Sequence, residues 1–310
     1  METIPVVSIG HLSEKYINGS SCKEDLYNDE TVKDILAKIT DAFTRWGFVY
    51  LTDHGINSDN VSKASREFFE KDKTFKSQFV RLSNEDNWGY VPYKYEAFDK
   101  TRPFDLKECF NFTLPRNKDE KIGEFFDTGL EFAQNCHKLT NVLLDVLSLA
   151  ICDDKEFLRS RHKYIDDIQK NATTLRLLYY PSIENEEDIL DKQLRCGEHS
   201  DYGTITLLFQ DEAGGLQVVS PNGEYVDATP IPGSIVVNIG DMMQIWTAGK
   251  FKSTRHRVLV ANRHQKARQS MAYFVQPDDD VEVSCLDGSD KFKPVKSKEY
   301  LISKFSDTYG

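Results

Sequence analysis

The feature that most constrains the fold is a change of hydrophobic period near residue 175. From there to about residue 275, short apolar runs alternate with turn signals such as Gly214-Gly215, Pro221-Asn222-Gly223 and Pro232-Gly233. Regularly spaced short strands are typical of a β barrel or a double-sheet jelly roll. The expected strands are Leu175–Tyr180, Gly203–Phe209, Leu216–Val219, Ser234–Ile239, Arg257–Val260 and Met271–Val275.

The first half of the chain has a different pattern. Apolar residues recur at helical spacing in Thr31–Phe43, Val61–Phe79 and Asn117–Ile151. Short strands are expected at Ile4–Ile9, Trp46–Leu51 and Asp105–Leu114, an aromatic loop at Trp88–Tyr95, and a last helix at Glu299–Phe305. We therefore predict a mainly β fold with flanking α: an N-terminal α/β region (1–165) packed on a jelly-roll core (166–310).

Composition excludes several classes of protein. The net charge of -11 argues against nucleic acid and against an anionic membrane surface, because phosphate contacts need clustered Lys and Arg. No apolar run approaches the roughly 20 residues that span a bilayer, and the N-terminus has no basic, apolar leader pattern. The six cysteines have irregular spacing, which favours reduced thiols. We expect a cytoplasmic protein, and the oligomeric state stays open.

Two histidines and a carboxylate form a candidate metal site. His199 and Asp201 are two residues apart, and residues at that spacing share a face of extended backbone. His256 stands at the mouth of the expected strand Arg257–Val260, which a barrel can bring alongside. Such a set occupies one face of a divalent ion and is the pattern of Fe(II) oxygenases. Zinc is the alternative, whereas His54 and His137 are interpreted as structural or surface histidines.

A second polar pair follows on the next expected strand. Arg268 and Ser270 share a face, and a guanidinium with a hydroxyl can hold a carboxylate. Tyr180, just before Pro181, can add a phenol. An isolated pair of this kind is most often a surface arginine, but its place after His256 favours a co-substrate anchor.

Together these residues resemble the isopenicillin N synthase-like family of iron and 2-oxoglutarate-dependent dioxygenases. The resemblance runs nearly end to end, with Asp53 and Leu178 standing where the family usually has Asn. It rests on Ile4-Pro5-Val6-Val7, Trp46-Gly47-Phe48, Asp53-His54-Gly55-Ile56, Tyr179-Tyr180-Pro181, His199-Ser200-Asp201, Gly214–Val218, Asn238-Ile239-Gly240-Asp241, Ser253–Val258, Arg268-Gln269-Ser270 and Phe274…Pro277.

The resemblance implies a jelly roll with packed N-terminal helices. It implies His199, Asp201 and His256 as iron ligands, and Arg268, Ser270 and Tyr180 at the distal carboxylate of 2-oxoglutarate. It also implies O2 as co-substrate, oxidation of a small organic molecule, with hydroxylation the expected outcome, and release of succinate and CO2.

Three alternatives stay open at this point. The first is a 2-oxoglutarate-independent iron oxidase of the same family, since some members keep the Arg-x-Ser pair without that co-substrate. The second is a non-catalytic ligand-binding relative, and the third is a zinc hydrolase, which lacks a convincing general base near His199. No catalytic residue beyond the ligands is assigned.

The substrate pocket is expected to include Phe274 and Leu178 and, from the loop Trp88–Tyr95, aromatic side chains. Lys94 and Arg102 are cations that can meet an acidic substrate, although solvation at the surface is the simpler interpretation for each. The identity of the substrate is beyond these patterns.

Overall fold

The computed structural model describes residues 3–19, 21–98, 101–114, 116–184, 189–260 and 266–309. Its helices are α1 (Gly10–Leu12), α2 (Lys23–Asn28), α3 (Glu30–Arg45), α4 (Asp59–Phe69), α5 (Lys73–Lys76), α6 (Gly123–Ile151), α7 (Asp241–Trp246) and α8 (Ser297–Tyr309), with a π-helical turn at Ser13–Ile17 and 3₁₀ turns at Ser77–Phe79, Glu120–Ile122 and Arg159–Arg161. Its strands are β1 (Val6–Ser8), β2 (Phe48–Thr52), β3 (Gly89–Val91), β4 (Glu108–Phe112), β5 (Thr174–Tyr180), β6 (Cys196–His199), β7 (Ile205–Gln210), β8 (Leu216–Val219), β9 (Tyr225–Asp227), β10 (Ser234–Ile239), β11 (His256–Val258), β12 (Arg268–Val275), β13 (Glu282–Val283) and β14 (Val295–Lys296).

Two facing sheets form the core of the fold. The main sheet has the order β1-β2-β10-β7-β12-β5-β4-β3, and the smaller one has the order β6-β11-β8-β9. Apart from the parallel β1–β2 pair, the neighbouring strands of both sheets are antiparallel. This arrangement confirms the predicted jelly roll.

Strand β12 contributes side chains to the hydrophobic cores on both faces of the main sheet. Ala272 and Phe274 belong with the residues between the two sheets, whereas Met271, Tyr273 and Val275 belong to the core under the helices. Successive side chains of a strand point to opposite faces, so a strand that is buried on both faces reads as a nearly continuous apolar run.

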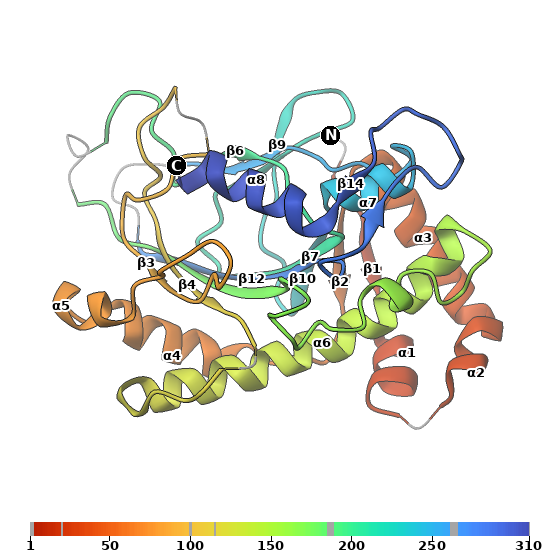
Figure 1. Ribbon diagram of the computed structural model, residues 1–310, viewed down its shortest axis with the longest axis horizontal. Coiled ribbons are helices and arrows are strands. Elements are labelled where there is room, and N and C mark those ends of the chain that lie inside the picture. The colour runs from red at the N-terminus through yellow and green to blue at the C-terminus, as the bar shows by residue number, and fades with distance from the viewer. Residues whose placement is uncertain are drawn as a thin grey trace.

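Helices cover one face of the main sheet. Figure 1 shows α6 and α4 beneath it and α8 on the other side, whereas α3 lies at the end of the sheet and contacts β1, β2 and α6. Helix α3 buries the stripe Val32, Ile35, Ile39 and Phe43. It begins where Asp29 Oδ1 accepts hydrogen bonds from the backbone N–H groups of residues 31 and 32, which satisfies donors that a helix start leaves free.

Two expected elements are wrong in their extent. The single helix expected at Val61–Phe79 is broken, because the Asp72 side chain accepts a hydrogen bond from the Phe75 N–H and starts a new helix there. The aromatic loop expected at Trp88–Tyr95 contains strand β3, which pairs with β4. All three residues of β3 are buried, so no alternation marked it as a strand.

Strands β1 to β4 come from the first 165 residues, and all four lie in the main sheet. The division of the chain at residue 165 therefore separates two stretches of sequence that share a sheet, and it stays a prediction. Within the described ranges, no helix combines the length and apolar character needed to cross a membrane. All six cysteines are free thiols, as expected.

Gly129 brings α6 close to the sheet, and this close approach can be tested. A Cβ atom there would lie 2.6 Å from the ring of Phe112 on β4. Alanine normally favours a helix over glycine by about 1 kcal/mol, but we expect Gly129→Ala to lower the free energy of unfolding by about 1–3 kcal/mol because of overpacking. Urea denaturation measures the change.

Gly123→Ala is the matched control, because its Cβ would meet only the end of the Lys118 side chain. This variant should be neutral or slightly more stable than the wild type. A Gly129→Ala protein that is at least as stable as the wild type would contradict the packing described for α6.

Candidate functional site

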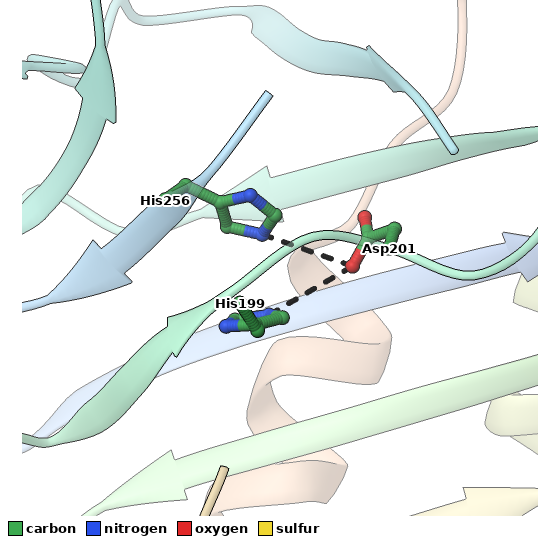
Figure 2. A group of neighbouring side chains, drawn as sticks. All are labelled: His199, Asp201 and His256. Atoms are coloured by element: carbon green, nitrogen blue, oxygen red, sulfur yellow. Dashed lines mark ion pairs between the residues drawn. The ribbon is translucent and has the colours of Figure 1, made fainter. Parts of the chain in front are cut away.

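The two candidate histidines face each other across a pair of strands. His199 ends β6, His256 begins β11, and the two are direct partners in the antiparallel register. Asp201 follows two residues after His199, and Figure 2 shows the three side chains converging. Asp201 Oδ1 lies 3.8 Å from His199 Nε2 and 3.7 Å from His256 Nε2. One ligand atom from each residue lies within 4.8 Å of the others, so the structure brings together the predicted set.

Backbone carbonyls fix the orientation of both imidazoles. His199 Nδ1 lies 2.8 Å from the carbonyl oxygen of Gly197, and His256 Nδ1 lies 3.1 Å from that of Thr254. Because a carbonyl only accepts, Nδ1 carries the proton in each ring. The lone pair of each Nε2 therefore points towards Asp201, which is the arrangement that a metal ligand needs.

The carboxylate of Asp201 is oriented from the main sheet. Asn238 on β10 donates its side-chain N–H to Asp201 Oδ2 at 2.7 Å, which leaves Oδ1 for an ion. Burial alone would raise the pKa of Asp201, but the two imidazoles and the Asn238 amide lower it overall. Burial, together with the neighbouring His256, lowers the pKa of His199 to about 3. A neutral imidazole and an ionised carboxylate are the protonation states that metal binding requires, so the 3.8 Å contact between His199 and Asp201 is not that of a charged pair.

The predicted anchor residues also lie together. Arg268 and Tyr180 are paired across β12 and β5, and the guanidinium carbon lies 4.7 Å from the centre of the tyrosine ring. Arg268 donates to Ser270 Oγ at 3.0 Å, to the Gly214 carbonyl at 2.8 Å and to Gln210 Oε1 at 3.4 Å.

Arg268 is only 2% exposed, and none of these three partners is a carboxylate. A buried guanidinium whose described partners are all neutral is costly, so the arrangement fits a carboxylate from a bound co-substrate. Burial raises the pKa of Tyr180, which keeps the phenol protonated as a further donor.

A cavity opens beside the His199–Asp201 stretch, between the sheets and helix α8. Its volume is about 60 Å³, which is room for roughly four to six water molecules or one small ring. It is lined by Asn87, Phe98, Asn111, Ala172, Thr174, Arg176, His199, Ser200, Asp201, Tyr202, Phe274, Gln276, Leu301, Phe305 and Thr308. Phe274, predicted as a pocket residue, lines this cavity. Leu178 lies elsewhere between the sheets, and Lys94 and Arg102 are not in the lining.

Sequence reasoning missed the polar wall of this cavity. Arg176 and Thr174 precede Tyr180 by four and six residues on β5, so the two-residue period of a strand could have placed them on the same face. Asn111 lies between Phe110 and Phe112, which both face the helices. The same two-residue period therefore directs Asn111 to the opposite face, where it lines the cavity. Phe98, which stacks on His199 at 4.2 Å between ring centres, lies far away in sequence and carried no signal.

The other weighed histidines have structural partners. His54 is buried against Phe209, and its Nδ1 accepts a hydrogen bond from the Ile56 N–H at 3.2 Å. His137 on α6 lies 2.9 Å from a carboxylate oxygen of Asp166. Among the described residues, neither histidine belongs to the candidate metal-binding group, and the partners of both fit the interpretation as structural or surface histidines.

Known proteins with similar sequences add a family to this geometry. Residues 171–277 match the model of the 2OG-Fe(II) oxygenase superfamily, and residues 4–130 match that of the non-haem dioxygenase N-terminal region named for morphine synthesis. A UPF0676 protein of Schizosaccharomyces pombe is 34% identical over 91% of this chain and 90% of its own. The 1-aminocyclopropane-1-carboxylate oxidase 2 of Malus domestica is 32% identical over 84% of this chain and 76% of its own.

Solved structures show the same similarity. A full-length Neurospora crassa protein in complex with alpha-KG superimposes with a TM-score of 0.80 and 30% identity, over 98% of this chain and 96% of that one. A second structure of the same protein, with 29% identity and the same TM-score and coverage, holds alpha-KG and thymine. These matches extend over both the helical half and the jelly roll, and they show that this chain belongs to the 2OG-Fe(II) oxygenase superfamily, the non-haem dioxygenases that depend on Fe(II) and 2-oxoglutarate.

Proposed function

We propose that this dioxygenase holds Fe(II) through His199, Asp201 and His256 and hydroxylates a C–H bond of a small organic molecule. The observation that carries the proposal is the convergence of three ligand atoms within 4.8 Å, each with its second polar atom already hydrogen-bonded. Two neutral imidazoles and one carboxylate leave half of the coordination sphere open. Bound there, Fe(II) activates O2 while 2-oxoglutarate is converted to succinate and CO2.

The residues of the chain bind and orient in this scheme. Arg268, Ser270 and Tyr180 hold the far carboxylate of 2-oxoglutarate, with three kinds of donor from two adjacent strands. Asn238 keeps Asp201 turned towards the ion. Phe98 and Phe274 exclude water from the cavity side of His199. No side chain is assigned as a general base.

The cavity wall supports a specific kind of prime substrate. Arg81 Nε donates to Asn87 Oδ1 at 2.7 Å, which identifies that atom as oxygen because an arginine cannot accept. Asn111 must then donate its N–H to Asn87, at 3.0 Å, and present its own oxygen elsewhere. Among the described residues, Asn111 Oδ1 and Gln276 Oε1 have no hydrogen-bond donor, although both side chains are buried.

Two buried acceptors without donors favour a ligand that carries N–H groups. The lining also includes the guanidinium of Arg176, and the aromatic rings of Phe98 and Phe274 suit a planar molecule. The Neurospora crassa structure that holds thymine, a ring with these features, supports the same direction. We therefore propose a single-ring compound with adjacent N–H and carbonyl groups as the prime substrate, and we place the enzyme in the cytoplasm, where six free thiols stay reduced.

The first prediction concerns the co-substrate anchor. Anaerobic titration of the Fe(II)-loaded protein with 2-oxoglutarate should produce the visible charge-transfer band of a chelated keto acid. In Arg268→Ala the dissociation constant should rise by about a hundredfold or more, because a buried charged hydrogen bond is lost. Arg257→Ala, which removes a guanidinium bound to Gln217 on the outer face, should leave it unchanged.

The same titration separates the alternatives. Bound iron with no band would favour a 2-oxoglutarate-independent oxidase of the same family. Failure of the wild type to bind iron would contradict the ligand assignment and favour a non-catalytic relative. A band without succinate in air, even with candidate substrates, would favour a binding protein.

The second prediction concerns Asn238. Asn238→Leu has a similar volume but removes the donor to Asp201 Oδ2, so the carboxylate should lose its orientation. We expect the Fe(II) dissociation constant to rise about 10- to 100-fold, as for other residues that orient metal ligands. Gln217→Leu is the control. It also removes a side-chain amide, one that donates to the Asp227 carboxylate at 2.9 Å within the smaller sheet. Equal iron affinities in the wild type and Asn238→Leu would contradict the proposal that Asn238 orients Asp201.

The third prediction concerns the prime substrate. Thymine should accelerate succinate formation, whereas 1,3-dimethylthymine, which lacks both N–H donors, should not. Asn111→Leu should raise the KM for thymine about tenfold or more, because the accepting oxygen is lost. Slow succinate formation that neither compound accelerates would reject this substrate class while leaving the dioxygenase activity in place.

A further inference from the structure

Four charged side chains are buried next to His199 and take no part in the scheme of iron and co-substrate binding. They are Glu96, Asp105, Lys107 and Arg176, and none is more than 9% exposed. Asp105 and Lys107 immediately precede β4, and Arg176 lies on β5 beside it. Burying four ions is costly and often stabilises less than apolar packing would. Their position next to a metal ligand therefore calls for a functional explanation.

These side chains form a continuous chain of contacts. Arg176 on the cavity wall donates to Glu96, Lys107 lies 3.2 Å from the other oxygen of Glu96, and Lys107 also contacts Asp105. Asp105 Oδ1 accepts the N–H of Gly197 at 2.9 Å. The carbonyl of the same Gly197 accepts from His199 Nδ1 at 2.8 Å. The contacts thus run from the cavity wall to the metal-binding imidazole.

The same cluster also holds the face of the imidazole. The Phe98 ring lies parallel to that of His199, with an interplanar angle of 8° and 4.2 Å between ring centres. The ammonium group of Lys107 lies 4.8 Å from the centre of the Phe98 ring, on which a cation is favourable. Lys107 therefore acts on His199 twice, through Asp105 and Gly197 and through Phe98.

The second imidazole has different surroundings. His256 Nδ1 contacts the carbonyl of Thr254, whose hydroxyl donates to the backbone of Trp46 at 2.8 Å. Phe48 meets the His256 ring edge-on, at 5.4 Å between ring centres. In these contacts no charged group stands behind the backbone carbonyl. The ionic support is thus specific to His199.

We propose that Asp105 is a positioning residue for His199 and acts through the Gly197 carbonyl and N–H. A carboxylate that accepts the N–H of Gly197 holds that residue in place, and with it the carbonyl that accepts from His199 Nδ1. The imidazole is thereby fixed in one tautomer and one orientation, with Nε2 directed at the proposed ion. The inference rests on the proposed role of His199 as an iron ligand.

Lys107 keeps Asp105 able to act in this way. Burial raises the pKa of Asp105, while Lys107 and the Gly197 N–H oppose that rise. A protonated Asp105 would be a weaker acceptor for the Gly197 N–H. The charge of Lys107 therefore supports the positioning role of Asp105.

The test compares Asp105→Asn with the wild type in anaerobic Fe(II) titrations and in the visible spectrum of the Fe(II)–2-oxoglutarate complex. Asparagine keeps an acceptor for Gly197 but removes the charge. We expect the Fe(II) dissociation constant to rise about tenfold and the charge-transfer band to shift in energy. A purely structural role would not move the band.

Glu108→Gln is the matched control. Glu108 is also buried and begins β4, directly after Lys107. It pairs with Lys76 at 2.7 Å and accepts from the Tyr90 hydroxyl, but no described contact joins it to His199, Asp201 or His256. This variant should lose stability in urea without changing iron affinity or the band. The inference fails if both variants weaken iron binding equally. It also fails if Asp105→Asn changes neither the iron affinity nor the energy of the band.

A double variant tests the proposal if Asp105→Asn does not fold. This double variant, D105N/K107M, removes one charge of each sign, and it should show the same shifts in iron affinity and band energy. Unchanged iron binding and band energy in a folded double variant would reject the proposal. A wild type that binds no iron would reject the proposed function itself, which separates the two failures.

Discussion

The pairing of His199 with His256 across β6 and β11 is the constraint on which the site depends. Direct register brings the two imidazoles together, but it does not orient them. Orientation comes from backbone carbonyls at Gly197 and Thr254, and the Asp201 carboxylate is oriented by Asn238 from the opposite sheet. The three side chains therefore converge only when the two sheets face each other, so the closed jelly roll and the candidate site form together.

Close backbone packing holds the turn that carries Asp201. A Cβ atom on Gly203 would lie 2.3 Å from the carbonyl of Val275, and one on Gly240 would lie 2.3 Å from the carbonyl of Gly203. The start of β7, the end of β12 and the end of β10 thus meet just after Asp201. Side chains at these glycines would push apart the strands that bring Asn238 and Asp201 within hydrogen-bond distance.

The sequence predicted what depends on short-range periodicity. His199 with Asp201, and Arg268 with Ser270, are pairs two residues apart, and the period of extended backbone was enough to place each pair on one face. The jelly roll followed from strand spacing in the same way. Phe98, Asn87 and Asp105 could not be found like this, because they reach the site from connections whose path depends on how β3, β4 and β6 pack. The break in the helix at Asp72 needed knowledge of a side-chain cap that competes with a continuous apolar stripe.

Charge balance connects the two halves of the site. In the proposed arrangement, the carboxylate of Asp201 leaves a divalent ion with one positive charge, and the buried guanidinium of Arg268 adds a second. The two carboxylates of 2-oxoglutarate offset both, so the metal, the co-substrate and their ligands together are neutral. The neighbouring cluster of Glu96, Asp105, Lys107 and Arg176 also contains two charges of each sign. A site balanced in this way gains little from a charged prime substrate, whose desolvation would have no counter-ion to offset it. The amide oxygens of Asn111 and Gln276 instead favour a neutral molecule that is recognised by hydrogen bonds.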